Sequence, residues 1–88
     1  MSALQPREGI VFQTTEHGAV LLDVTTGQFY GLNHVAAVAW TALARAGTTE
    51  DAVAAILDRF DIDEPVARTD VNGLITALCS RGLLSSTP

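Results

Sequence analysis

The chain has 88 residues, of which 48% are hydrophobic and 17% charged, which is the composition of one globular domain and not of a disordered segment. Five arginines against ten Asp and Glu give a net charge of −5, and the arginines are scattered. A scattered set of basic residues is a poor match to a phosphate backbone, so the composition argues against nucleic acid as a partner. A single cysteine excludes an internal disulfide, and no long apolar run suggests a membrane span, so we expect a cytoplasmic protein.

The first third of the chain predicts three β-strands. Ile10 to Thr14, Ala19 to Val24 and Gln28 to Leu32 are rich in β-branched, aromatic and leucine residues, and short Gly-containing turns separate them. Such connections predict an antiparallel meander whose first and third strands are the edges of the sheet. Asp23 ends the second strand, where its carboxylate is expected to accept N–H groups of the following turn.

The rest of the chain predicts three helices. Asn33 is suited to cap the first helix, and Gly47 to end it in a left-handed conformation. Thr48 and Asp51 resemble a capping box at the start of the second helix. Apolar residues then recur at helical spacing: Ala36, Trp40 and Leu43 in the first helix, Val53, Ile56, Leu57 and Phe60 in the second, and Val71, Leu74, Ile75 and Leu78 in the third.

The order of these elements, βββααα, predicts the fold class. The third helix is expected to run from about Pro65, which suits the first helical position, to about Arg81, with Gly82 ending it. Residues 83–88 are expected to form a short strand or a loose tail. We therefore expect one α+β domain over residues 1–88, with its core at about 9–84: a winged helix-turn-helix-like domain, in which a three-stranded antiparallel sheet precedes a three-helix bundle.

Few residues in the sequence are suited to catalysis. His17 and His34 are expected at the surface, and Cys79 is expected to behave as a buried or half-buried apolar residue. The acidic residues within 61–64 are expected to form a solvated loop that caps a helix. The sequence contains no metal-ligand, nucleotide-binding or nucleophile motif. We therefore predict a protein that is not an enzyme and has no catalytic residue, metal or cofactor.

Several short segments occur along the chain in a particular order and spacing: "LLDVTTGQFYGLN", "AW", "TEDAVAAILDRF", "DVNGLITAL" and "RGLL". On these segments the chain resembles the PqqD-like family over about Phe12 to Leu84. These RiPP recognition elements bind the leader segment of ribosomally made peptide precursors. The aromatic pair Phe29-Tyr30, with Trp40 seven residues after Asn33, is most similar to the standalone B1 proteins of lasso-peptide biosynthesis.

The resemblance implies a mechanism of β-strand addition. The leader, typically with a Tyr-x-x-Pro pattern, would join the third strand of the sheet, pack against the third helix, and be presented to a leader peptidase (B2) and a macrolactam cyclase. Alternation places Phe29 and Gly31 on one face of that strand and Tyr30 and Leu32 on the other. The sequence does not decide which of the two faces lines the groove. The expected peptide-binding residues are Gln28, Phe29, Tyr30, Gly31, Leu32, Arg68, Val71, Leu74, Ile75 and Leu78.

Other functions stay open at this point. The same family includes the carrier of the pyrroloquinoline quinone precursor peptide, which is the main alternative. A winged-helix DNA-binding regulator is a further alternative, although the acidic charge counts against it. Ordinary core is the alternative role for Leu32, Leu74 and Leu78, and a solvated helix charge is the alternative for Arg68.

Overall fold

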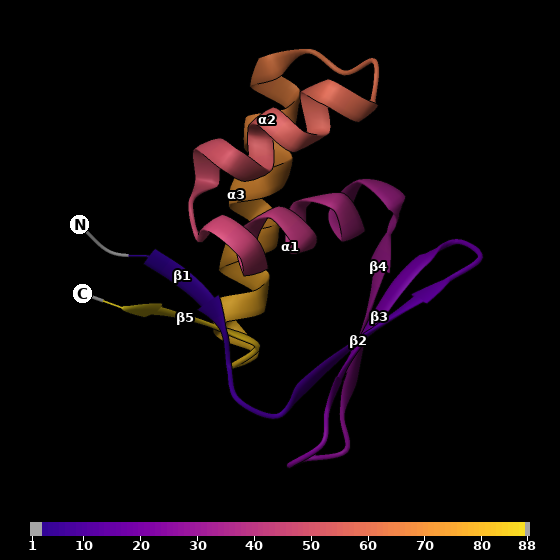
Figure 1. Cartoon of the computed structure of the whole chain (residues 1–88), viewed down its shortest axis with the longest axis vertical. Coiled ribbons are helices and arrows are strands. Elements are labelled where there is room, and N and C mark those ends of the chain that lie inside the picture. Colours follow the sequence, from indigo (N-terminus) through magenta and orange to yellow (C-terminus); the bar gives the residue numbers. More distant parts are fainter. Residues whose placement is uncertain (1–2, 88) are drawn as a thin grey trace.

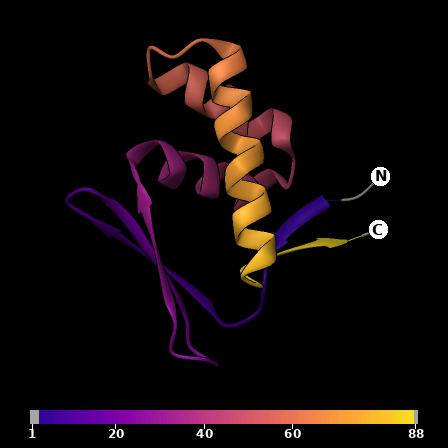
Figure 2. The same ribbon diagram turned by 180° about the vertical axis from the view of Figure 1, so that it is seen from behind.

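The computed structural model describes residues 3–87, which form two antiparallel sheets and three helices (Figure 1). One sheet has three strands in the order β2-β3-β4, and the other pairs β1 with β5. α1 packs against one face of the three-stranded sheet, and α3 runs across the back of α1 (Figures 1 and 2). In chain order, the elements are β1 (Ala3–Pro6), β2 (Ile10–Thr15), β3 (Gly18–Asp23), β4 (Phe29–Asn33), α1 (His34–Ala46), α2 (Thr49–Arg59), α3 (Glu64–Ser80) and β5 (Leu84–Thr87).

The register of β4 against β3 decides which of its side chains face the helices. Tyr30 lies opposite Leu21, which is fully buried. Leu32, on the same face of β4, is 6% exposed, whereas the side chain of Phe29 is 72% exposed. The alternation expected along this strand is therefore confirmed, and the face left open by the sequence is settled: Tyr30 and Leu32 point to the helices.

The turns between the strands depend on two particular residues. Gly18 begins β3 with φ +148°, and a Cβ there would lie 1.9 Å from the backbone oxygen of Leu32. Only glycine lets the two strands approach this closely. After β3, the Asp23 carboxylate accepts the backbone N–H groups of Thr25 (2.9 Å) and Thr26 (3.4 Å), which confirms its predicted role in the turn.

The helix ends follow the local chemistry of the sequence. The Asn33 side chain accepts the Ala36 N–H at 2.8 Å and caps α1, and Gly47 ends that helix with φ 78°. At the start of α2, Thr48 Oγ1 accepts the Asp51 N–H at 3.1 Å. In a capping box the Asp51 carboxylate would accept the backbone N–H of Thr48. Here it accepts the Thr48 hydroxyl instead, at 2.6 Å. All three expected signals therefore mark real helix ends.

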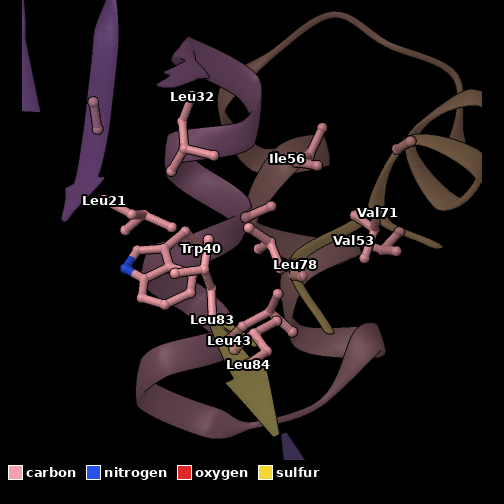
Figure 3. Close-up of a cluster of buried hydrophobic side chains, with 14 residues drawn as sticks. Leu21, Leu32, Trp40, Leu43, Val53, Ile56, Val71, Leu78, Leu83 and Leu84 are labelled. Carbon is pink, nitrogen blue, oxygen red and sulfur yellow. The ribbon is translucent and has the colours of Figure 1, made fainter. Parts of the chain in front are cut away.

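The core is a single apolar cluster in which sheet, helices and β5 meet (Figure 3). Its side chains point toward one another from every layer, and none of the described side chains buried there is polar or charged. Hydrophobic burial therefore carries the stability of the domain. The largest fully buried side chains are Leu21, Leu43, Ile56, Val71 and Leu78.

The β1–β5 pair is the main departure from the predicted order βββααα. The sequence predicts no strand before Ile10, yet residues 3–6 pair with 84–87, and the Leu4 N–H donates to the Gly47 carbonyl at 2.8 Å. Pairing between the two ends of a chain is a long-range contact that no local pattern encodes. Of the two outcomes expected for residues 83–88, a short strand is the one that forms, as far as Thr87.

Three further expectations are corrected by the structure. Leu57 is 38% exposed, because α2 buries the side of the helix that carries Ala52, Val53 and Ile56. Cys79 is exposed and not buried, since it lies off the apolar side of α3. Pro65 occupies the second position of α3, one residue after the helix begins. His17 and His34 lie at the surface as predicted.

Candidate functional site

The free edge of β4 is the first part of the candidate site. On one side β4 pairs with β3 from Phe29 to Asn33, and within residues 3–87 no strand pairs with its other side. An edge strand presents unpaired N–H and C=O groups to any extended chain that approaches it. The five-residue edge of β4 is therefore a place where one further strand can add.

One side of α3 forms the second part. Asp70, Leu74 and Arg81 are spaced four and seven residues apart, so they lie along the same side of the helix. That side faces β4 and the start of α1, across a hollow of about 370 Å³. Residues from β4, α1, α2 and α3 line this hollow, among them Asn33, Val35, Asp70, Gly73 and Leu74.

Tyr30 of β4 and Arg81 at the end of α3 are in contact. The Arg81 guanidinium lies over the Tyr30 ring, 5.0 Å from its centroid, which is the geometry of a cation–π contact. The two residues also border a small hollow with Phe29 and Leu83. We call these two hollows together the β4–α3 groove; its residues are Tyr30, Asn33, Val35, Asp70, Gly73, Leu74 and Arg81.

The structure brings only some of the predicted site residues to this groove. Tyr30 and Leu74 line it and are half-buried, and Gln28 and Phe29 lie at its Arg81 end. Gly31 is exposed on the outer face of the sheet, which the helices do not cover. Three further members of the predicted set are buried in the core, at 6% exposure or less: Leu32, Val71 and Leu78. Of these, Val71 also borders the hollow beside Leu74.

Arg68 and Ile75 lie on α3 away from the hollow and do not line it. Arg68 donates to both carboxylate oxygens of Glu50 at the start of α2, at 2.6 and 3.0 Å, and Glu64 lies 3.9 Å away. The hydrogen bond and charge of Arg68 hold the pKa of the Glu50 carboxyl below its ordinary value of 4.5, and Glu50 in turn raises the pKa of Arg68. Ile75, seven residues after Arg68, shares that side of the helix and packs against the core.

Other groove residues were not among those predicted from the sequence. They include Val35, Asp70, Gly73 and Arg81. A signal for Arg81 is present in the sequence, because it follows Leu74 by seven residues and Leu78 by three. Extending the helical spacing of Leu74 and Leu78 by one turn therefore identifies Arg81 as a residue on the same side of α3.

Two properties of the described residues bear on other kinds of site. Within residues 3–87, no group of three or more His, Cys, Asp and Glu side chains is placed to hold a metal ion. None of the helices in that range is long and apolar enough to cross a membrane.

The chain is similar to proteins of known family and structure. Residues 18–84 match the family described as coenzyme PQQ synthesis protein D (PqqD). No curated protein matches the chain.

Two solved structures are similar to this chain over nearly its full length. One is described as lasso peptide synthetase B1 complexed with the leader peptide; it has a TM-score of 0.80 and 26% sequence identity, over 98% of this chain and 99% of that one. The other is TbiB1 in complex with the TbiA(beta) leader peptide, with a TM-score of 0.81 and 27% identity, over 92% of this chain and 94% of that one. Because the family match spans most of the sequence, this chain belongs to the PqqD family.

Proposed function

We propose that this protein is a non-catalytic leader-peptide recognition element of a lasso-peptide pathway. The leader segment of a precursor adds as an antiparallel strand to β4 and packs its apolar side chains into the β4–α3 groove. One observation carries the proposal: the likeness, over nearly the whole chain, to two B1 proteins whose structures hold a leader peptide. In this proposal the winged helix-turn-helix-like arrangement serves to bind a peptide and not DNA.

Backbone pairing alone gives the complex modest affinity. Five residues of β4 can form about four or five hydrogen bonds with a leader, each contributing about 0.5–1.5 kcal/mol net. Ordering a flexible peptide offsets much of this gain. The apolar anchors therefore decide affinity and specificity, and the half-buried side chains of Tyr30 and Leu74 are the surfaces on which those anchors pack.

The predicted site residues then divide by role. Gln28 to Leu32 supply the backbone edge, and Tyr30 also supplies a ring that Arg81 holds in place. Leu74 and the exposed Gly73 form the α3 wall, where a leader backbone can approach closely because a Cβ on Gly73 would meet nothing within 4 Å. Val71 and Leu78 support that wall from the core. Arg68, paired with Glu50, fixes α3 against α2.

We propose that binding serves to present the precursor to partner enzymes. A leader held on β4 leaves the rest of the precursor free for a leader peptidase (B2) and a macrolactam cyclase. Carrying the substrate on a protein that also binds the enzyme raises the effective concentration of the cleavage site.

The proposal is tested by fluorescence polarisation with a labelled lasso leader that carries the Tyr-x-x-Pro pattern. We expect micromolar or tighter binding that collapses when the Tyr and Pro of the peptide are both replaced by Ala. Equal binding of the two peptides, or binding of neither, would contradict the proposal.

A matched pair of variants locates the binding side of α3. Leu74→Ala and Ile75→Ala each shorten a half-buried side chain of the same helix that packs against the core, but only Leu74 lines the groove. Because a buried leucine contributes about 1.5–3 kcal/mol, Leu74→Ala should lower leader affinity by about tenfold or more, and Ile75→Ala by less than about twofold. Circular dichroism of both variants shows whether the fold is intact. Equal losses of affinity would place the leader elsewhere.

The family match favours a second candidate, a carrier of the pyrroloquinoline quinone precursor peptide. The same polarisation assay separates the two candidates when a labelled peptide of that precursor is included. Preference for it over several lasso leaders would move the assignment to this carrier while leaving the site unchanged.

A further inference from the structure

β2 is the second edge of the three-stranded sheet, and nothing in its sequence protects it from pairing. Its residues, "IVFQTT", include no charged residue and no proline, and all of them from Val11 to Thr15 are exposed. The register with β3 runs without a bulge from Ile10 to Thr15. Proteins usually blunt a long edge strand with lysine, proline or a bulge. An edge without these features is suited to accept a strand.

A groove larger than the one at β4 runs along the inner face of β2. It has a volume of about 650 Å³ and lies between β2 and the helices α1 and α2, on the other side of α1 from α3. Phe12 of β2, Val38 of α1 and Phe60 at the end of α2 are among its apolar lining residues. Side chains of a strand added to β2 would alternate between this groove and the outer face of the sheet.

The charges that line this groove are all positive. Arg45 and Arg59 both line it, and none of its lining residues is an Asp or Glu. Within residues 3–87, the ion pairs are made by Arg68, so neither of these two arginines has a carboxylate within 4.0 Å. Asp51, which shares a neighbouring hollow with Arg45, is engaged by the Thr48 hydroxyl. In a chain with net charge −5, this positive and apolar groove is complementary to a segment with carboxylates beside apolar side chains.

We propose that β2 and this groove, together the β2–α1 groove, dock an extended acidic and apolar segment of the enzyme that cleaves the leader-bound precursor. This inference rests on the proposed function, because it identifies the partner as the leader peptidase. The segment adds to β2 as a strand, places apolar side chains beside Phe12 and Phe60, and directs carboxylates to Arg45 and Arg59.

The position of the two edges explains how both ligands bind together. β3 lies between β2 and β4, so a leader on β4 and a peptidase segment on β2 extend one sheet from opposite sides. Neither competes for the backbone groups of the other. Leader and peptidase are thus brought to one small domain at the same time.

The test measures binding of the pathway's leader peptidase to the immobilised protein by biolayer interferometry, with saturating leader peptide. The groove variants are Arg45→Glu/Arg59→Glu and Phe12→Glu. We expect each to lower peptidase affinity by at least tenfold, and the wild-type affinity to fall as salt rises. In the wild-type complex, hydrogen exchange of the backbone amides of residues 10–15 should slow, because strand addition protects an edge.

Matched controls separate the groove from general effects of charge. Val66→Glu introduces a carboxylate at an exposed apolar residue of α3 that lines neither groove, and Arg7→Glu reverses an arginine that does not line the β2–α1 groove. Both should bind the peptidase as the wild type does. Leader binding by polarisation should be unchanged in every variant, which also shows that each is folded.

Each remaining outcome overturns a particular statement. Peptidase binding that is absent in the wild type, or unaffected by the groove variants, overturns the inference while leader binding stands. A wild-type dimer in solution that the groove variants dissociate would make the occupant a second copy, which also overturns it. Loss of leader binding by the wild type is a separate readout and overturns the proposed function itself.

Discussion

Tyr30 serves both the fold and the site. Its ring packs against the edge of the core opposite Leu21, while its outer side lies under the Arg81 guanidinium at the end of the β4–α3 groove. Removing the ring therefore disturbs stability and binding together. Arg81 is the better probe of the site, because it is exposed and touches the ring only from outside.

Replacing Arg81 with Gln removes the cation and keeps a side chain of similar reach. An exposed cation–π contact contributes about 0.5–1 kcal/mol, so the free energy of unfolding should fall by no more than that. Leader affinity should fall about two- to fivefold, because the ring is less firmly held. Urea unfolding and fluorescence polarisation measure the two effects, with Arg7→Gln as the control. Unchanged leader affinity would remove Arg81 from the site.

Burial separates two leucines that the sequence treats alike. Leu78 is fully buried, and Leu57 is 38% exposed. We expect Leu78→Ala to lower the free energy of unfolding by about 2–5 kcal/mol and Leu57→Ala by less than about 1 kcal/mol. Urea denaturation followed by circular dichroism checks both values. Similar losses in the two variants would mean that the apolar side of α2 is placed differently from the one described.

At the scale of elements, α3 carries a glycine in an exposed position within the helix. Gly73 lies on the groove side, and a Cβ added there would meet nothing within 4 Å. A neighbouring helix therefore does not require it. The close approach of a leader backbone would require a glycine at this position.

The variant Gly73→Ala distinguishes these two roles. It should stabilise the free protein by about 0.5–1 kcal/mol, because alanine loses less conformational freedom in a helix than glycine. It should also weaken leader binding, because the new methyl group narrows the groove. Thermal unfolding and polarisation measure the two changes on one sample. A more stable variant with full leader affinity would show that the leader does not approach α3 at this turn.

The elements that could be predicted are those fixed by local chemistry. Asn33, Gly47 and Thr48 mark helix ends through hydrogen bonds to residues three or four positions away, so short motifs were sufficient. The β1–β5 pair was missed, because its two strands are at opposite ends of the chain and "ALQP" has no alternating apolar pattern.

The site was harder to predict than the fold. The sequence identified β4 and α3, but the side of α3 that faces β4 depends on how the helix rotates when its core residues pack. This rotation places Leu74 in the groove and its neighbour Ile75 outside it. The groove along β2 gave no sequence signal, since Phe12, Val38 and Phe60 come from three separate elements.

For the molecule as a whole, the Arg68–Glu50 pair links α3 to α2 and makes stability depend on pH. The pKa of Glu50 is lowered in the folded protein, so the pair stabilises the fold above pH 4.5 and is lost as the pH falls through the lowered pKa. We expect Glu50→Gln to be less stable than the wild type at pH 7 and equally stable once the carboxyl is protonated. Urea unfolding across this range checks the sign.

Glu16→Gln is the matched control, because within residues 3–87 the Glu16 carboxyl is in no ion pair. It should leave the difference between neutral and acidic pH unchanged. A stability difference between Glu50→Gln and the wild type that persists at the acidic end would assign the effect of Glu50 to packing and not to charge.

The pairing of β1 with β5 also makes the chain nearly circular. Ala3 lies opposite Thr87, so β1 and β5 are separated by one strand spacing, roughly 5 Å. The two strands lie side by side in Figure 1. A short linker can therefore join them, and new ends can be opened in the loop between α2 and α3 to give a circular permutant with the same sheet. A fusion partner attached next to β1 or β5 would lie at the same pole of the molecule, on the far side of α3 from β4 (Figure 2). Such a tag leaves the peptide-binding edge unobstructed.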